Sequence, residues 1–177
     1  GEEDGKFNGS GGICFDADGD VWIVNTFDSK VQKFSKDGKY ISGFGVKGSG
    51  DGEMEMPYGI AIDDNGDIYI ADWGNDRVQK FTPDGEYLQT FGYLEPEELR
   101  LNHPSDVAVD SEGDVYVADW GNKKVQIFDS DGEILTSLYG DDTELSRSAL
   151  EFMEVNEDYH KAFKRAKDKS RLGLFER

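Results

Sequence analysis

Residues 57–92, PYGIAIDDNGDIYIADWGNDRVQKFTPDGEYLQTFG, decide the fold of this chain. Four short apolar runs follow one another in this segment, and turns rich in glycine, asparagine and aspartate separate them. Short apolar runs bounded by such turn formers are typical of β-strands. The segment therefore predicts four strands joined by tight turns, at 60–62, 68–71, 78–81 and 87–91.

The same pattern occurs three times at a fixed offset of 47 residues: GGICFDADGDVWIVN, YGIAIDDNGDIYIAD and SDVAVDSEGDVYVAD begin at residues 11, 58 and 105. Four strands in each of several equivalent units of this length are the sequence form of a β-propeller blade. The repeat therefore predicts an all-β propeller segment. Its parts are an entering loop at 1–10 and three four-stranded blades at 11–45, 58–92 and 105–140.

Residues 57–92 resemble an NHL repeat along their whole length, and PSDVAVDSEGDVYVADWGNKKVQIF at 104–128 resembles it nearly as well. The first copy departs from the pattern at 25–28, where Asn-Thr-Phe-Asp replaces Asp-Trp-Gly-Asn. The resemblance covers about four fifths of the chain and implies a six-bladed type of propeller, of which three blades are half. It does not imply one function, because this fold carries protein binding, RNA binding, ligand sensing and lyase chemistry.

Three blades do not close a ring, so each end blade would expose an apolar flank. Two completions fit the sequence. A second copy could join around a two-fold axis, blade 3 of one against blade 1 of the other, to give six blades. Alternatively, the chain is a piece of a longer propeller. Self-association of the three-plus-three kind is the predicted partner contact.

Residues 141–177 follow a different pattern, with apolar residues at helical spacing and basic residues toward the end. The spacing predicts a helical hairpin, with helices at about 143–154 and 157–169. Helical insertions occur between blades in NHL-like proteins, and this tail resembles one that is cut short. The alternative is a terminal cap over an exposed edge. The apolar positions are Leu145, Ala149, Phe152, Met153, Tyr159, Ala162, Phe163 and Ala166.

The chain is strongly acidic, with 38 acidic and 19 basic residues and a net charge of −19. Such a surface repels nucleic acid and anionic membranes, so neither is predicted as a partner. No apolar run approaches the ~18 residues of a membrane span. The single Cys14 excludes an internal disulfide and a cysteine-based zinc cluster.

Closely spaced acids precede each second strand, as in Asp16-Ala17-Asp18-Gly19-Asp20 and its counterparts at 63–67 and 110–114. Calcium prefers such oxygen ligands. However, the glycine precedes the last aspartate and no glutamate follows at position twelve of an EF-hand loop. Aspartates in this pattern favour local bonds to backbone N–H groups instead. The segments are interpreted as turns, and no metal or cofactor is predicted.

The turns after the second strands repeat Asp-Trp-Gly-Asn at 72–75 and 119–122. In an up-and-down blade they lie at the same end as the long loops 46–57 and 93–104, and loops supply most binding residues on rigid scaffolds. Aromatic rings beside amide groups suit a protein or small ligand. The alternative is a turn-stabilising network with the tryptophans packed on neighbouring blades. The candidate ligand-binding residues are Tyr58, Trp73, Asn75, His103, Trp120 and Asn122.

Catalytic motifs are missing from the sequence, which contains no G-x-S-x-G elbow, no H-E-x-x-H and no glycine-rich phosphate loop. No catalytic residue is therefore predicted. The predicted function is a non-enzymatic scaffold that binds a protein, a peptide or a small ligand. The alternative is a propeller enzyme, of a lyase or hydrolase-like kind, whose metal-dependent channel site forms only on assembly.

Overall fold

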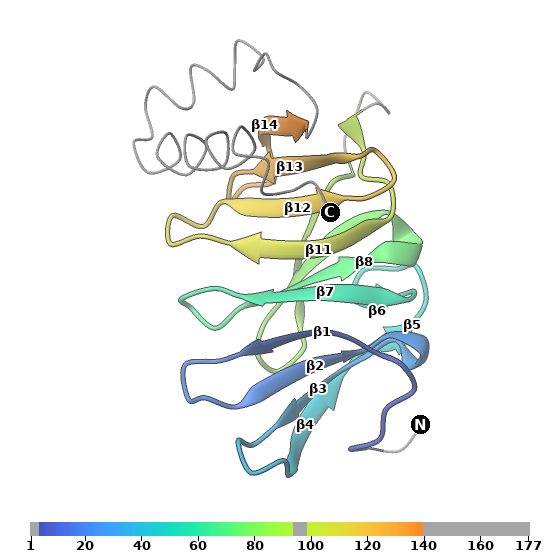
Figure 1. Cartoon of the computed structure of the whole chain (residues 1–177), viewed down its shortest axis with the longest axis vertical. Coiled ribbons are helices and arrows are strands. Elements are labelled where there is room, and N and C mark those ends of the chain that lie inside the picture. The colour runs from blue at the N-terminus through green and yellow to red at the C-terminus, as the bar shows by residue number, and fades with distance from the viewer. Residues whose placement is uncertain (1–3, 94–98, 140–177) are drawn as a thin grey trace, which may run out of the picture.

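A computed structural model of the 177-residue chain describes residues 4–93 and 99–139. Within these ranges three four-stranded antiparallel sheets stack one after another, and each sheet follows simple sequence order (Figure 1). This arrangement confirms the prediction of an all-β chain with three propeller blades. The helical hairpin predicted for the tail lies outside the described residues.

Each blade contains the four strands that its repeat predicts. Blade 1 has β1 (Ser10–Phe15), β2 (Val21–Asn25), β3 (Lys30–Phe34) and β4 (Tyr40–Phe44). Blade 2 has β7 (Pro57–Ile62), β8 (Ile68–Asp72), β9 (Arg77–Phe81) and β10 (Tyr87–Phe91). Blade 3 has β11 (Pro104–Val109), β12 (Val115–Asp119), β13 (Lys124–Phe128) and β14 (Ile134–Tyr139).

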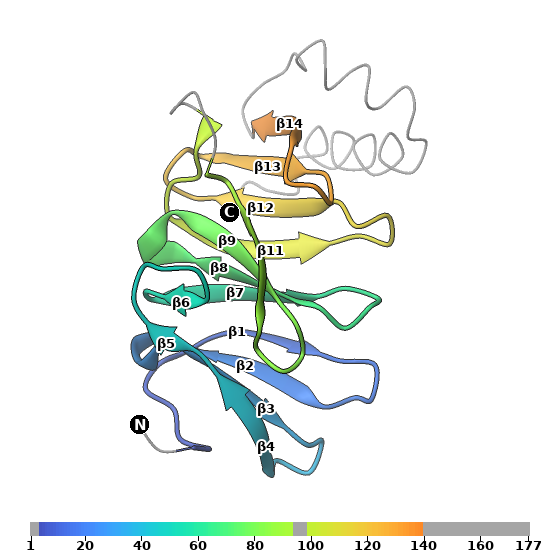
Figure 2. The ribbon, with the colours of Figure 1, turned by 180° about the vertical axis from the view of Figure 1, so that it is seen from behind.

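The loops at one end of the blades carry structure that the repeat pattern did not predict. Between blades 1 and 2, β5 (Val46–Lys47) and β6 (Glu53–Met54) form a short parallel pair (Figure 2). Short 3₁₀ turns, η1 (Thr26–Asp28) and η2 (Trp73–Asn75), follow the second strands of blades 1 and 2. The first strand of blade 2 also begins three residues earlier than the apolar run indicates.

Blade 2 lies between blades 1 and 3, and both of its faces are buried. Successive side chains of its strands point to opposite sides and so enter different cores. On β8, Ile68 and Ile70 contact the core shared with blade 1, whereas Tyr69 and Ala71 contact the core shared with blade 3. Aromatic pairs cross both junctions: the Phe44 and Phe81 ring centroids are 5.1 Å apart, and those of Phe91 and Phe128 are 6.2 Å apart. The cores of the molecule therefore lie between the sheets.

The inner strands approach so closely that glycine is required at two equivalent positions. A Cβ atom on Gly12 would lie 2.7 Å from the carbonyl oxygen of Tyr58, and one on Gly59 would lie 2.5 Å from the Cα atom of Asp106. Real Cβ atoms do not come this near to backbone atoms. The strands β1, β7 and β11 are therefore neighbours in space, and Asp106 holds the equivalent position in blade 3.

The outer face of blade 1 is apolar and exposed. Phe7, Ile13 and Phe15, which we call the blade 1 flank, are 43%, 60% and 68% exposed. Their counterparts one repeat later, Met54 and Ile60 among them, belong to the core between blades 1 and 2. The blade 1 flank thus has the chemistry of an internal junction, but no blade of the described chain covers it.

Candidate functional site

The acidic turns lie at one end of the blades, at the left of Figure 1. The first aspartate of each turn accepts hydrogen bonds from backbone groups of the same turn. Asp63 Oδ1 accepts hydrogen bonds from the backbone N–H groups of Asn65 and Asp67, both at 2.9 Å, and Asp63 Oδ2 accepts one from the Tyr69 hydroxyl at 3.1 Å. Asp16 and Asp110 make the equivalent bonds. This geometry supports the interpretation of the segments as turns.

In blades 1 and 2, a lysine on the third strand forms ion pairs with two aspartates of the acidic turn. Lys33 Nζ lies 2.8 Å from a carboxylate oxygen of Asp16 and 3.2 Å from one of Asp20. Burial opposes the charge of Asp16, but hydrogen bonds from Lys33 and Trp22 outweigh it and lower the pKa of Asp16. Lys80 makes the same pair of contacts in blade 2. Blade 3 carries Ile127 at this position.

The opposite end carries the tryptophan turns and the interblade loops, as the strand order predicts. The N–H of Gly74, in the turn after β8, donates to the carbonyl oxygen of Glu55 at 2.8 Å. In blade 3 the N–H of Gly121 donates to the carbonyl oxygen of Asn102, also at 2.8 Å. Each turn is therefore bonded to the loop that enters its own blade.

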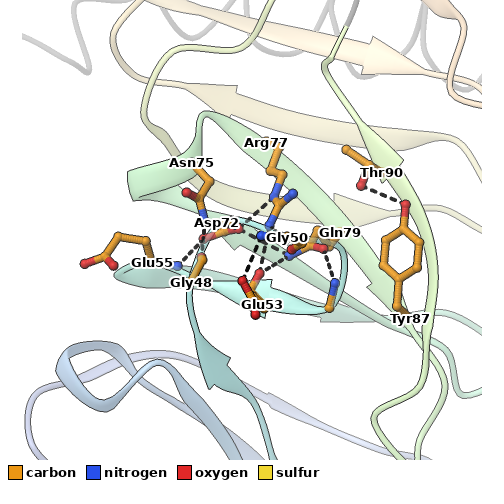
Figure 3. A network of polar contacts seen from close by, with 11 residues as sticks. Gly48, Gly50, Glu53, Glu55, Asp72, Asn75, Arg77, Gln79, Tyr87 and Thr90 are labelled. Carbon is orange, nitrogen blue, oxygen red and sulfur yellow. Dashed lines mark hydrogen bonds and ion pairs between the residues drawn. The ribbon is translucent and has the colours of Figure 1, made fainter.

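Asp72 is the centre of a buried polar network at this end (Figure 3). Its Oδ1 accepts from the Glu55 N–H at 2.7 Å, and its Oδ2 accepts from Asn75 Nδ2 at 2.8 Å and Arg77 Nε at 2.9 Å. Burial raises the pKa of Asp72, against bonds from Asn75, Glu55 and Arg77 that favour its charge. Because Asp72 is fully buried, these partners are needed to hold its carboxylate.

The same network ties down the loop before blade 2. Arg77 Nη2 donates to the carbonyl oxygens of Gly50 and Glu53, both at 2.8 Å, and Asn75 Nδ2 also donates to that of Gly48 at 2.9 Å. In blade 3, Asn122 Nδ2 repeats this pattern with Asp119 at 2.8 Å and the Arg100 carbonyl at 2.9 Å. The amide groups of two candidate site residues thus have a structural role, as the alternative interpretation held.

Blade 1 keeps this network although its sequence departs from Asp-Trp-Gly-Asn. Asn25 takes the place of Asp72 and Asp28 takes the place of Asn75, so acid and amide are exchanged. Asn25 Oδ1 accepts from the Asn8 N–H at 2.7 Å, and Asn25 Nδ2 donates to Asp28 Oδ2 at 2.8 Å. The departure at 25–28 is therefore a reciprocal exchange of acid and amide, which an alignment of the three repeats reveals at the two positions.

Three of the candidate residues form one aromatic cluster, Tyr58, Trp73 and His103. The Trp73 ring centroid lies 6.1 Å from that of Tyr58 and 4.2 Å from that of His103, which belongs to the loop before β11. The His103 N–H donates to Asp76 Oδ1 at 2.7 Å, and its backbone φ of 51° is left-handed. The aromatic cluster therefore bridges blades 2 and 3.

A polar hollow of about 620 Å³ opens beside the aromatic cluster and is lined by residues of both blades. The predicted Asn75 and Asn122 line it, together with Asp76 and Asn102, which contact His103. The sequence analysis missed Asp76, Asn102, Tyr93 and Arg100 as lining residues. The signal that could have found the last three was their place in the long loop at 93–104. The Arg100 guanidinium lies 5.3 Å from the centre of the Tyr93 ring.

Trp120, the sixth candidate, lies elsewhere. It is 67% exposed and lines a different hollow, of about 580 Å³, with Val125 and Leu138 on the outer face of blade 3. Its equivalent in blade 2, Trp73, packs on His103 of the next blade. Trp120 is exposed because no further described blade supplies such a partner. The structure thus gathers five of the six candidates around the junction of blades 2 and 3.

Chemically reactive groups are few in this part of the chain. Among residues 4–93 and 99–139 no group of three or more His, Cys, Asp or Glu side chains could hold a metal ion. Burial and the charge of Asp16 raise the pKa of the free Cys14 thiol to about 12, which makes it a poor nucleophile. Over the same ranges no helix is both long and apolar enough to cross a membrane.

The stacked four-stranded sheets and the loop-rich end define a β-propeller protein. A family model described as the SMP-30/gluconolactonase/LRE-like region matches residues 5–95, and the NHL repeat model matches residues 101–128. The chain belongs to the SMP-30/gluconolactonase/LRE-like family, and its third blade contains an NHL repeat. A comparison with curated proteins finds no significant match.

Solved structures share the fold with this chain at low sequence identity. A streptogramin B lyase is 21% identical with a TM-score of 0.57, covering 74% of this chain and 40% of its own. The Kuenenia stuttgartiensis hydrazine synthase is 18% identical with a TM-score of 0.60, covering 77% and 37%. U3-55K is 14% identical with a TM-score of 0.59, covering 74% and 39%. The chain thus spans about two fifths of the length of these structures.

Proposed function

We propose that this chain is a non-enzymatic scaffold that binds a peptide or a small polar ligand in the hollow between blades 2 and 3. The observation that supports this most is that two lining residues of the hollow, Asp76 and Asn102, also contact His103 of the aromatic cluster. The Tyr93 ring offers a stacking surface in the hollow, while Arg100 and Asp76 offer a cation and a carboxylate at the same opening. Concave sites with a few convergent polar groups are the usual places for ligands.

The contacts around His103 favour binding over catalysis. Its backbone N–H is bonded to Asp76, and its Nδ1 contacts the side-chain oxygen of Asn102 at 2.5 Å. A general base needs a nucleophile within hydrogen-bond reach. Among the described residues, no serine or threonine hydroxyl and no cysteine thiol is hydrogen-bonded to His103. A metal-dependent enzyme assembled from further blades is the alternative, and it makes a different prediction about metal binding.

A ligand screen by NMR tests the proposal and requires no assumption about which compound binds. The probes are a library of short peptides and a library of polar fragments, each added to the full chain. We expect hits to shift the Trp73 indole and His103 imidazole signals, while the acidic turns stay unperturbed. Hits that instead perturb only the acidic turns would contradict the proposal, as would Zn²⁺ or Mn²⁺ binding that shifts carboxylate signals of the described residues.

A further inference from the structure

The outer face of blade 3, which we call the blade 3 flank, occupies the positions through which blade 2 contacts blade 3. Most of these positions are apolar, so the flank is built to be covered. Its end near the tryptophan turns is hollow, with Trp120 exposed, whereas Ile127 and Thr136 farther along are only 0% and 4% exposed. The flank consists of Tyr116, Ala118, Val125, Ile127, Thr136 and Leu138.

One residue of this flank differs in charge from its equivalents at the internal junctions. Lys33 and Lys80 reach across the ring of a neighbouring aromatic residue to pair with the two acids of their turn. Ile127 replaces them in blade 3. The internal junctions thus carry a lysine at this position, and the blade 3 flank carries an apolar side chain there.

A second residue differs in size. Gly12 and Gly59 have no side chain because the inner strand of the following blade lies against them. Asp106 occupies this position in blade 3 and is exposed. A blade that approached β11 as closely as β7 approaches β1 would collide with the Asp106 side chain. The blade 3 flank is therefore not shaped for another blade in the same geometry.

We propose that residues 141–169 of this same chain cover the blade 3 flank. The segment follows β14 directly and needs no long connection. Two predicted helices of about twelve residues would each be ~18 Å long, similar to the ~17 Å of a five-residue strand, so the segment matches a blade in length. Its apolar positions, with Leu145, Phe152 and Phe163 among them, supply side chains for the hollow beside Trp120.

Charge complementarity favours the same occupant. The turns of blade 3 bring together Asp110, Glu112, Asp114 and Asp129, and no lysine or arginine of the described residues forms an ion pair with the first or third of them. Burial and these neighbouring charges raise the pKa of Asp114. The second predicted helix of the segment, residues 157–169, carries five basic residues against three acids, whereas residues 141–154 carry five acids against one base, so the second helix is the part that complements these turns. Its basic residues are Lys161, Lys164, Arg165, Lys167 and Lys169.

The test compares the same substitution on the two flanks of the full chain. Ile127→Lys installs the lysine that the other blades carry at this position, and Ile13→Lys is the matched control on the blade 1 flank. Hydrogen exchange followed by mass spectrometry reports on residues 141–169 and on β13 and β14. We expect Ile127→Lys to speed exchange in these segments by about tenfold or more, and Ile13→Lys to leave them unchanged.

A second variant, Leu145→Ser with Phe152→Ser, keeps the test decisive if Ile127→Lys folds poorly. It leaves the described blades unsubstituted, and we expect it to speed exchange in β13 and β14. Unchanged exchange in both variants would overturn the proposal. The proposal would also be overturned if Ile127→Lys and Ile13→Lys each converted a dimer into a monomer. That result would identify a second copy of the chain as the occupant of the blade 3 flank.

Discussion

The same residue type meets different surroundings in successive blades. Asp67 in blade 2 lies 3.0 Å from Lys80 Nζ, whereas its equivalent Asp114 in blade 3 faces other carboxylates and Ile127. The repeat keeps the carboxylate because the turn sequence is shared. The contribution of this carboxylate charge to stability then depends on one residue of the third strand. We expect the charge to stabilise blade 2 and to destabilise blade 3.

We expect Asp67→Asn to lower the free energy of unfolding at pH 7 by a few tenths to ~1 kcal/mol. Asp114→Asn should raise it, because the pKa of Asp114 is higher in the folded state than in the unfolded chain. At a pH above this raised pKa, the charge of Asp114 destabilises the folded state. Below pH ~3.9 the carboxyl group is protonated in both states, so the stability gained by Asp114→Asn should vanish there. Urea unfolding of both variants at pH 7 and pH 3.5 measures this. A gain for Asp114→Asn that persisted at pH 3.5 would point to a cause other than charge.

The turn after each second strand is the element that joins a blade to its entering loop. Its network survives an exchange of acid and amide between Asn25–Asp28 and Asp72–Asn75. The shared feature of the network is thus a hydrogen bond between one acidic and one amide side chain that are three residues apart in the sequence, with a basic residue nearby. Hydrogen-bond complementarity, and not the identity of either residue, holds the element.

Asp72→Asn alone should cost about 3 kcal/mol, because it leaves Arg77 buried without its carboxylate and sets two amides face to face. The double variant, Asp72→Asn with Asn75→Asp, reproduces the order found in blade 1 and should recover about half of that loss. A double-mutant cycle by urea unfolding, with Asn75→Asp as the second single variant, gives the coupling. Additive effects would show that the exchange in blade 1 needs other compensating residues.

The strands could be predicted because their turns carry a strict glycine and aspartate pattern. The pair of β5 and β6 could not, since two-residue strands depend on loop closure by Arg77 and Asp72 more than on their own residues. For the candidate site, strand order alone was enough to predict at which end of the blades its residues lie. The separation of Trp120 from Trp73 did not, because identical repeat positions differ only in whether a further blade lies beyond them.

The three described blades form a stack with two unlike ends (Figure 1). The blade 1 flank keeps the apolar pattern of an internal junction, while Ile127 and Asp106 change that pattern on the blade 3 flank. Closure of a six-bladed ring by a second copy is the prediction from the repeat, and it competes with the proposed covering of the blade 3 flank because both need that surface. Covering of the blade 3 flank by the tail leaves the blade 1 flank as the surface for self-association.

We expect the full chain to self-associate at micromolar concentration through the blade 1 flank, because exposed apolar surface yields roughly 25 cal/mol per Å² when buried. The double variant Ile13→Lys with Phe15→Lys should be monomeric, since charge on this surface opposes its burial. Static light scattering over a concentration series measures the mass. A wild-type chain that stays monomeric throughout would contradict this expectation.

We propose that the end with the tryptophan turns binds the ligand. The most direct measurement is calorimetric titration of the best hit of the NMR screen into Trp73→Ala, with the paired variant Asp18→Ala and Asp64→Ala as the control on the opposite end. We expect at least tenfold weaker binding for Trp73→Ala, corresponding to ~1.4 kcal/mol, and unchanged affinity for the control. Weaker binding in the control alone, with unchanged affinity in Trp73→Ala, would place the site at the acidic turns instead.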